Sequence, residues 1–276
     1  NTFKWWKNIN KNLNFDTLTK KEGVLKKNSI TAIIACYKDE LAIPIMYEKL
    51  VKIFREKKVD YEIIFVNDCS PDNSHSIIKD ISSKDPRVIG ITHSRNFGSQ
   101  AAFLSGLEMA NKEACVLLDG DLQDPPELIP KFMEEWKKGA EVVYGRRTKR
   151  EMMFGLEVFY KTFYFIFDKL SDIQIPRNAG DFSLIDKKVV RWILECGERD
   201  FFLRGIRAYV GFKQVGVDYL RAERMFGKTT NSLIKNVGWA KKAIFSFSQL
   251  PLHLLTLIGG IATLLTFILG LYIVFL

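Results

Sequence analysis

Two aspartates separated by one residue, Asp119 and Asp121, are the side chains whose type and spacing most strongly suggest chemistry. They follow the apolar run 114–118, whose length fits a buried strand. Two prolines at 125 and 126 come soon after and are typical of the first turn of a helix. The pair is therefore predicted to lie on a loop at the carboxyl end of a strand, where open α/β sheets bind their ligands.

The acid pair can be interpreted in two ways. A lone D-x-D also occurs in ordinary acidic surface turns, but here Gly120, Gln123 and Asp124 surround it, and the strand and helix signals flank it. Two carboxylates this close repel each other unless a cation lies between them. A hard divalent ion shared with a diphosphate, as Mg²⁺ commonly is, would supply that cation. The context favours this functional interpretation.

Polar side chains also follow the other predicted strands. Each could be an ordinary turn residue or helix cap, a description that fits Asp72 and Asn73. Because the carboxyl ends of neighbouring parallel strands meet at one edge of a sheet, the whole set would line a single cleft. Arginines in such a cleft suit phosphate oxygens through their planar guanidinium groups. The set consists of Tyr37 and Asp39, Asn67 and Asp68, the run Ser94-Arg95-Asn96-Phe97-Gly98, Asp119 and Asp121, and Arg146 and Arg147.

Apolar runs and helical repeats alternate along much of the chain. This alternation predicts an α/β domain with a mostly parallel sheet and helices on both faces, and we assign it residues 29–228. No G-x-G-x-x-G follows any predicted strand, so the usual dinucleotide fingerprint is absent. The predicted strands are 30–35, 61–67, 88–92, 114–118, 141–144, 181–186 and 213–220, and the predicted helices are 40–57, 73–83, 99–111, 126–138, 187–196 and 201–210.

The C-terminal part of the sequence has a different composition. No Asp, Glu, Lys or Arg occurs from Ala243 to Leu276. Since a helix of about 20 apolar residues crosses a bilayer, residues 250–276 are predicted to form a transmembrane helix. Lys241 and Lys242 lie just before it, and the positive-inside rule therefore predicts that the rest of the protein is cytoplasmic.

Three further segments are predicted to contact the membrane surface or have this as one interpretation. Residues 1–28 form either a short interfacial helix or a disordered leader. The aromatic segment 154–170 is predicted to lie at the membrane surface, with a core helix under the sheet as the alternative. Residues 229–249 are predicted to be a juxtamembrane interfacial helix. The net charge of +9 fits an anionic membrane surface and phosphorylated substrates, and no nucleic-acid motif accompanies it.

Several motifs, taken in order, resemble those of family 2 glycosyltransferases with the GT-A fold. More narrowly, they are similar to the polyprenyl-phosphate glycosyltransferases, a group that includes dolichol-phosphate mannose synthase and bactoprenol glucosyltransferases. The Q-x-x-R-W motif of the processive synthases is absent, which argues for transfer of a single sugar. The motifs are Cys36-Tyr37-Lys38-Asp39, Val66 to Asp72, Ser94 to Gly98, Asp119 to Glu127, Gly145-Arg146-Arg147, Gly180-Asp181-Phe182 and Arg224 to Lys228.

The resemblance implies a role for each site residue. Asp181 would lie near the reacting centre, and together with Asp119 and Asp121 it forms the predicted catalytic set. The sequence departs from the family at Lys38-Asp39, Ser183 and Thr230, which affects the acceptor contacts more than the metal site. The nucleotide sugar would contact Tyr37, Asp39, Asp68, Asp119, Gly120, Asp121 and Arg147; Asp119, Asp121 and Gln123 would hold the metal; and Arg146, Arg147, Arg224 and Lys228 would bind the acceptor and its phosphate.

The resemblance also implies an activity. It predicts an inverting transferase that moves one sugar from a nucleotide sugar, UDP in preference to GDP, to polyprenyl (undecaprenyl) phosphate with Mg²⁺ or Mn²⁺. The expected place is the bacterial inner membrane, with the catalytic domain on the cytoplasmic side, and homo-oligomerisation stays open. One alternative is a tethered transferase to a hydroxyl acceptor, with Asp181 as general base. Another is a non-catalytic protein that binds a nucleotide sugar or an anionic lipid.

Overall fold

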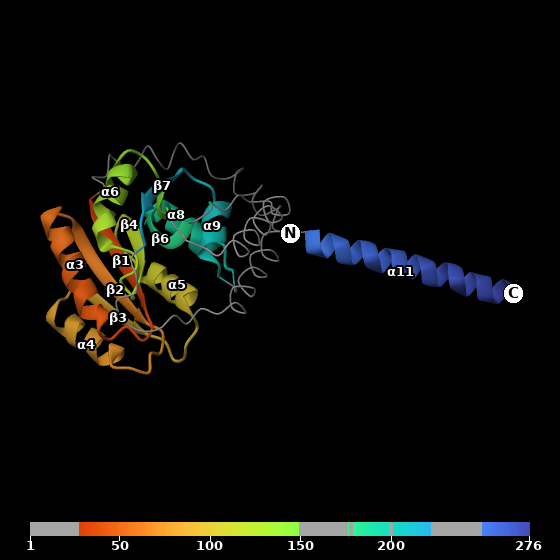
Figure 1. The fold of residues 1–276 in the computed structure, drawn as a ribbon, viewed down its shortest axis with the longest axis horizontal. Coiled ribbons are helices and arrows are strands. Elements are labelled where there is room, and N and C mark those ends of the chain that lie inside the picture. The colour runs from red at the N-terminus through yellow and green to blue at the C-terminus, as the bar shows by residue number, and fades with distance from the viewer. Residues whose placement is uncertain (1–27, 149–175, 177–178, 199–200, 222–249) are drawn as a thin grey trace.

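The structure is a computed structural model that describes residues 28–148, 176, 179–198, 201–221 and 250–276. Its strands and most of its helices form one α/β body, and a long C-terminal helix extends away from that body (Figure 1). Residues 1–27 and the segments 154–170 and 229–249 lie outside the described residues. The interpretations of these three segments therefore stay predictions, as do the domain boundaries.

In the described part of the chain, seven strands form a single sheet in the order β3-β2-β1-β4-β6-β5-β7. Four of the six neighbouring pairs are parallel, and the two antiparallel pairs both involve β6. The predicted mostly parallel sheet is thus confirmed, with one reversed strand inside it. The strands are β1 (Ser29–Cys36), β2 (Asp60–Asn67), β3 (Val88–Thr92), β4 (Ala114–Asp119), β5 (Val142–Arg147), β6 (Ala179–Asp186) and β7 (Gln214–Tyr219).

Helices cover both faces of this sheet. Figure 1 shows α3, α4 and α6 on one side and α5, α8 and α9 on the other. Along β1, Ile30 and Ile34 pack into the core on the α3 side, whereas Ile33 and Ala35 pack into the core on the α5 side. Because both faces of the sheet are buried at its centre, β1, β2 and β4 are nearly continuous apolar runs, which is why the sequence located them. The helices are α3 (Ala42–Glu56), α4 (Ser74–Lys84), α5 (Ser99–Met109), η1 (Pro126–Leu128), α6 (Ile129–Lys137), α8 (Lys187–Glu195), α9 (Leu203–Tyr209) and α11 (Leu250–Phe275).

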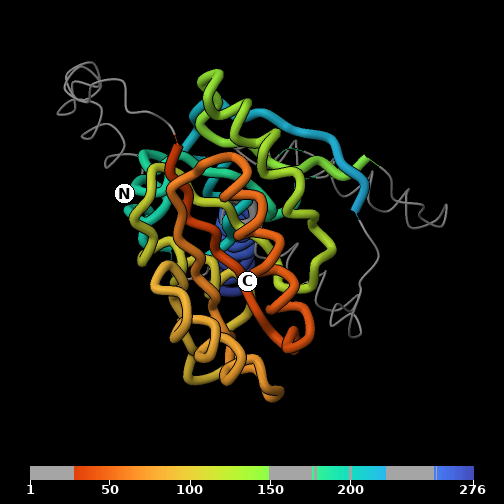
Figure 2. Tube along the Cα trace, turned by 90° about the vertical axis from the view of Figure 1, so that its left-hand side faces the viewer, coloured from red at the N-terminus to blue at the C-terminus, as the bar shows by residue number. Residues whose placement is uncertain are grey.

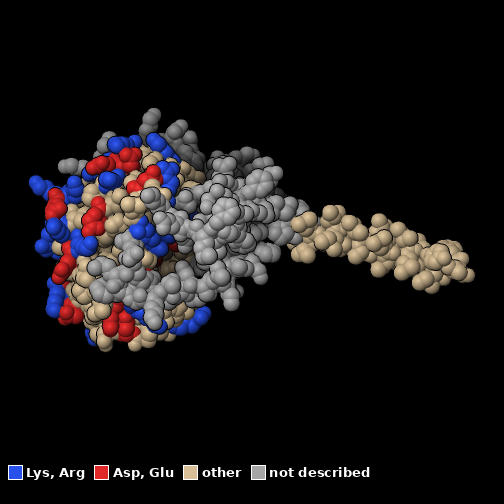
Figure 3. All heavy atoms as spheres, in the orientation of Figure 1, with Lys and Arg blue, Asp and Glu red and all other residues tan. Residues whose placement is uncertain are grey.

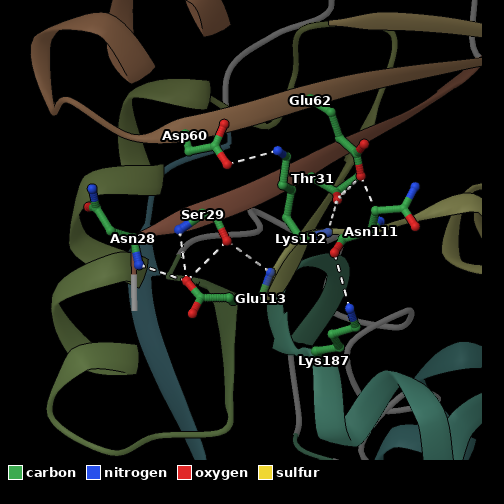
Figure 4. Close-up of polar contacts among 9 residues, drawn as sticks. All are labelled: Asn28, Ser29, Thr31, Asp60, Glu62, Asn111, Lys112, Glu113 and Lys187. Carbon is green, nitrogen blue, oxygen red and sulfur yellow. Dashed lines mark hydrogen bonds and ion pairs between the residues drawn. The ribbon is translucent and has the colours of Figure 1, made fainter. Parts of the chain in front are cut away.

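A polar network fixes the amino edge of the sheet, where β1, β2 and β4 begin (Figure 4). The Glu113 carboxylate accepts hydrogen bonds from the backbone N–H and the hydroxyl of Ser29, at 3.1 and 3.0 Å. The buried Glu62 carboxylate accepts hydrogen bonds from the Thr31 hydroxyl and from the Asn111 N–H. These bonds join segments far apart in the sequence and set the register of the three strands at one end.

One predicted boundary is wrong in a way that affects the site. The predicted strand 141–144 continues to Arg147, so Arg146 and Arg147 lie in β5 and not in a loop after it. Its parallel pairing with β7 runs as far as Arg147 opposite Tyr219, and this partner strand is what keeps the chain extended. Successive strand residues point to opposite faces, so the two arginines diverge.

The C-terminal helix α11 carries an apolar segment, Leu254–Phe275, of 22 residues with a mean hydropathy of 2.3. This segment is long and apolar enough to cross a membrane, and none of it is buried in the protein. Figure 2 views α11 nearly along its axis, and Figure 3 shows charged atoms on the body but none on α11. Length and composition thus agree with the predicted span.

Candidate active site

Most of the predicted site residues gather at the carboxyl edge of the sheet. The parallel strands β1, β2, β3 and β4 all end there, and β5 and β7 run in the same direction. Because β6 runs the opposite way, its first residues reach this edge. Leu117 of β4 pairs with Ser183 of β6; Asp119 lies two residues after Leu117, and Asp181 lies two residues before Ser183, so both lie at this edge. The reversed strand therefore brings the third predicted acid beside the first two.

The acid loop after β4 is tightly constrained. The Gly120 N–H donates to the Ala35 carbonyl oxygen at 2.9 Å, and a Cβ on Gly120 would lie 2.7 Å from Asp39 Oδ2. Leu122 has a φ of +59°, a left-handed conformation that is strained for a branched side chain. The mostly buried Asp121 accepts a hydrogen bond from the Gln123 N–H at 3.1 Å. The loop holds its carboxylates in fixed positions.

The loops after β1 and β2 are joined to each other beside this acid loop. Asp39 Oδ2 accepts the Tyr37 N–H at 2.8 Å, and the contact with Gly120 places this turn against the acid loop. The Lys38 N–H donates to the Ser70 hydroxyl at 2.7 Å, and that hydroxyl donates to Asp72. The structure therefore brings the predicted nucleotide residues Tyr37 and Asp39 next to the acid pair.

Negative charge accumulates around Asp119. The Asp119 side chain is about a third exposed, but partial loss of water, together with the nearby Asp124 and Asp121 carboxylates, raises the pKa of Asp119 above its usual range. Asp181 adds to this effect, whereas the Arg221 guanidinium opposes it. A carboxylate with this environment is stabilised by a bound cation.

The oxygen donors at the acid loop fit a hard divalent ion. Among the described residues there is no group of three or more His, Cys, Asp or Glu side chains arranged to hold a metal. Mg²⁺ is usually bound by one or two carboxylates together with substrate phosphates and water. Asp119 and Asp121 therefore suit an ion whose coordination is completed by a diphosphate.

A second cluster is centred on the buried Asp124 carboxylate, whose importance the sequence did not reveal. The Tyr219 hydroxyl donates to Asp124, and Arg147 Nη2 lies 3.9 Å from its Oδ1 atom. Arg221 bridges the two acid groups, with Nε 3.4 Å from Asp124 Oδ1 and Nη2 3.9 Å from Asp119 Oδ2. Arg221 was missed because it lies just beyond the predicted last strand, where no motif pointed to it.

The arginine pair of β5 separates in the structure. Arg147 reaches Asp124 and donates to the Tyr219 hydroxyl at 3.3 Å, so it lies within the predicted site. Arg146 instead forms a solvent-exposed ion pair with Asp218 on β7. The structure thus groups Arg147, but not Arg146, with the acids. Arg224 and Lys228 lie outside the described residues, and their predicted phosphate contacts stay predictions.

Asp68 is buried and bonded within the protein. Its Oδ1 atom accepts the Phe97 N–H at 2.8 Å and its Oδ2 atom accepts the Gly98 N–H at 2.7 Å. The His93 ring nitrogen Nδ1 lies 2.8 Å from Oδ1, and the His93 ring packs edge-on against Phe97. Asp68 therefore fixes the loop that joins β3 to α5, and its predicted contact with the nucleotide base stays a prediction.

Asp181 has partners that sequence reasoning missed. Gln100 Nε2 of α5 donates to Asp181 Oδ2 at 3.0 Å, and Arg204 Nε of α9 lies 3.3 Å from Asp181 Oδ1. Gln100 also accepts the Leu203 N–H at 2.9 Å, which ties the start of α9 to α5. These residues are far apart in the sequence, and only the fold shows that they meet.

This arrangement of acids, arginines and strand ends can be compared with known proteins. The chain matches the profile of "Glycosyl transferase family 2" over residues 31–194. The chain belongs to glycosyl transferase family 2. The match covers β1 to α8 and includes the acid pair, the Asp68 loop and Asp181.

Curated relatives in the family are similar over most of the chain. The Bacillus subtilis glycosyltransferase YkcC is 42% identical over 232 residues, which cover 82% of this chain and 71% of the relative. The Escherichia coli K12 prophage bactoprenol glucosyl transferase homolog is 39% identical over 249 residues, covering 89% and 80%. The bactoprenol glucosyl transferase of Shigella phage SfV is 37% identical with the same coverage.

A solved structure supports the GT-A fold of this glycosyl transferase. Mannosyl-3-phosphoglycerate synthase from Rubrobacter xylanophilus aligns with a TM-score of 0.54 at 11% identity, over 79% of this chain and 72% of that one. At this identity the likeness concerns the fold alone. It agrees with the predicted architecture of a mostly parallel sheet with helices on both faces.

Proposed function

We propose that this family 2 glycosyl transferase moves one sugar from a nucleotide sugar to polyprenyl phosphate, with inversion at the anomeric carbon. The observation that carries the proposal is the gathering of the Asp119, Asp121 and Asp181 charges beyond the pairing of β4 with β6. The bactoprenol glucosyl transferases among the relatives support a polyprenyl-phosphate acceptor and a glucosyl donor. UDP is proposed in preference to GDP because the relatives reported above are bacterial or phage proteins.

The metal site follows from the acid loop. Asp119 and Asp121, with Gln123 beside them, would hold Mg²⁺ or Mn²⁺ against the diphosphate of the donor. The ion would supply positive charge where negative charge develops on the leaving nucleoside diphosphate. Gly120 leaves room for Asp39 to approach the loop, which keeps the donor side of the cleft compact.

Arginines on the other side of the acids would also stabilise the negative charge of the donor's diphosphate. Arg147 and Arg221 both point at Asp124 beside the acid pair, so they would neutralise phosphate oxygens of a bound donor. Tyr37 and Asp39 would contact the nucleoside, and Asp68 would support that region by holding the β3–α5 loop. Arg224 and Lys228 stay predicted acceptor contacts.

The acceptor's chemistry explains why a strong base is not needed. A phosphate monoester has a second pKa near ~6, so at neutral pH it is largely a dianion and already a nucleophile. The protein's contribution would be to hold this phosphate behind the anomeric carbon, opposite the diphosphate. Attack from that side inverts the centre. Asp181, held by Gln100 and Arg204, would border the place where the two substrates meet.

Membrane attachment would bring the enzyme to its lipid. The helix α11 is proposed to span the bacterial inner membrane, with the α/β body on the cytoplasmic side where nucleotide sugars are made available. The lipid bilayer is then a partner of the protein, and self-association within the membrane stays open. Holding the cleft near the lipid phosphate would raise the effective concentration of the acceptor.

A transfer assay with the full chain tests this proposal. We expect labelled glucose to pass from UDP-glucose to undecaprenyl phosphate with Mg²⁺ or Mn²⁺, to stop in EDTA, and to resume when the ion is restored. Asp121→Asn should lower turnover by about 100-fold or more, because a metal ligand beside the leaving group is lost. Asp80→Asn, an equivalent change on the exposed surface of α4, should not alter it.

Three results would contradict parts of the proposal. Full activity in EDTA, or in the Asp121→Asn variant, would remove the metal site. Transfer to a sugar or protein hydroxyl in preference to polyprenyl phosphate would favour the alternative acceptor, with Asp181 as base. Binding of UDP-glucose without transfer to any acceptor would favour a binding protein.

A further inference from the structure

Arg207 on α9 is fully buried, yet none of its three side-chain nitrogens has a hydrogen-bond partner among the described residues. Its guanidinium lies over the Tyr144 ring, 5.3 Å from the ring centre. A buried charge that has lost its water and has no hydrogen-bond partner is destabilising, although here the Tyr144 ring and the charge of Asp181 favour it. Because Arg207 does not stabilise the described α/β body through hydrogen bonds, its role is to be sought in ligand binding.

A second arginine lies one turn earlier on the same helix. Arg204, at position i−3 from Arg207, is about a third exposed, and its Nε atom is 3.3 Å from Asp181 Oδ1. The other carboxylate oxygen of Asp181 already accepts a hydrogen bond from Gln100. The Asp181 charge also acts on the Arg207 guanidinium, so two positive charges share one carboxylate and the α9 side of the site keeps an excess of positive charge.

The opposite side of the cleft has the reverse imbalance. Among the described residues, that side has three carboxylates but two guanidinium groups and so keeps an excess of negative charge. The carboxylates belong to Asp119, Asp121 and Asp124, and the guanidinium groups to Arg147 and Arg221. That side suits a divalent ion carrying a diphosphate. The α9 side suits a separate anion that enters without a metal. The two sides meet at the boundary between β4 and β6.

We propose that Arg204 and Arg207 form the anion site for the phosphate of the acceptor, an inference that rests on the proposed function. Arg204 is the contacting residue, because its side chain is partly exposed whereas Arg207 is buried, and its guanidinium can exchange Asp181 for a phosphate oxygen. Arg207 is a positioning residue that acts through its charge from behind. In a low-dielectric interior such a charge acts strongly over several ångströms. With Arg207 present, Asp181 does not fully neutralise Arg204.

This role explains why an unpaired charge is retained. Residues that serve a bound ligand commonly reduce the stability of the free protein. Replacing Arg207 with an apolar side chain of similar length should therefore weaken acceptor binding without lowering thermal stability. A purely structural arginine would behave in the opposite way, because its removal would lower the stability and leave ligand binding intact.

The test uses the full chain in detergent, with Arg207→Met, Arg207→Lys and Arg204→Gln. Arg191→Met, an exposed arginine on α8, is the control for loss of one positive charge. A water-soluble prenyl phosphate is titrated into protein saturated with UDP and Mn²⁺, and UDP with Mn²⁺ is titrated separately. A charged hydrogen bond or close ion pair corresponds to an affinity change of about ten- to a hundredfold.

We expect Arg207→Met and Arg204→Gln to weaken prenyl phosphate binding by about tenfold or more. Arg207→Lys should retain most of the affinity, and Arg191→Met all of it. UDP affinity should stay within about twofold in every variant, since the donor site has its own arginines. The melting temperature of Arg207→Met should be no lower than that of the wild type.

The failures of the two proposals are distinguishable. If the wild type itself does not bind prenyl phosphate, the proposed acceptor is wrong. If it binds and both Arg207→Met and Arg204→Gln bind equally well, the anion site is wrong while the proposed function stands. A loss confined to UDP affinity would assign these arginines to the donor. If Arg207→Met does not fold, an unchanged affinity in Arg204→Gln still overturns the inference.

Discussion

Replacing Asp68 with asparagine is expected to lower the stability of the protein, an effect that a residue serving only to bind the nucleotide would not have. The Asp68 side chain is 3% exposed and accepts the Phe97 and Gly98 N–H groups on different oxygens, at 2.8 and 2.7 Å. Asparagine has one oxygen in place of two, so at least one of these N–H groups would face an NH₂ group. The charge that strengthens the remaining bond would also be lost.

The size of this effect can be worked from the contacts. A hydrogen bond to a charged group contributes about 1.5–3 kcal/mol, and a buried donor left unpaired costs about as much again. We therefore expect Asp68→Asn to lower the free energy of unfolding by about 3 kcal/mol. For a domain of this size that corresponds to a fall in melting temperature of about 6–12 °C.

The measurement is thermal unfolding of the full chain, paired with titration of UDP at a temperature where each variant is folded. Asp60→Asn is the matched control, because Asp60 forms an ion pair with Lys112 and its side chain is 69% exposed. That change should alter stability by less than about 0.5 kcal/mol. If the two variants melt together while Asp68→Asn alone loses UDP, the carboxylate serves the nucleotide directly and our account of the loop is wrong.

Two further predictions concern stability far from the site. Hydrogen bonds from Arg87 lower the pKa of the buried Asp85 to about 2, so the stability that the ionised carboxylate contributes at pH 4 is lost towards pH 2. Asp85→Asn should therefore flatten the dependence of stability on pH in acid unfolding, whereas the exposed control Asp80→Asn should leave it as in the wild type. An Asp85→Asn slope equal to that of the wild type or of Asp80→Asn would contradict this prediction. Lys58 follows α3 with a φ of +51°, a left-handed conformation that glycine adopts without strain, so Lys58→Gly should raise the melting temperature by about 2 °C. Lys57, at φ −85°, has no such strain, so Lys57→Gly should lower the melting temperature. Changes of equal sign in the two variants would refute the backbone argument.

Much of the proposed donor site could be predicted from the sequence. Strands β1, β2 and β4 are buried on both faces, so they appear as apolar runs, and each is followed by polar residues that the parallel arrangement must bring together. Asp119 and Asp121 were placed correctly at a strand end because the strand and the two prolines bound the loop so closely. The broad family assignment followed from these same motifs.

The rest depends on information that a local pattern does not contain. An apolar strand has the same pattern in either direction, so nothing in the sequence marked β6 as reversed. The bond from Gln100 to Asp181 joins residues 81 positions apart, and the buried Arg207 gave no periodic signal. Nor could the sequence show the left-handed conformations of Cys69 and Leu122 in the loops of the site, because glycine is the usual marker of such positions.

The order of strands in the sheet also has a consequence for synthesis on the ribosome. The four strands β3-β2-β1-β4 are contiguous in space and come first along the chain, so they can pair as soon as β4 has emerged. β5 is made next, yet among the described strands its neighbours are β6 and β7, which follow it. Until β6 emerges, β5 has no partner and the far edge of β4 is open. The nascent chain therefore passes through a stage with unpaired strand edges, the kind of exposure that chaperones cover.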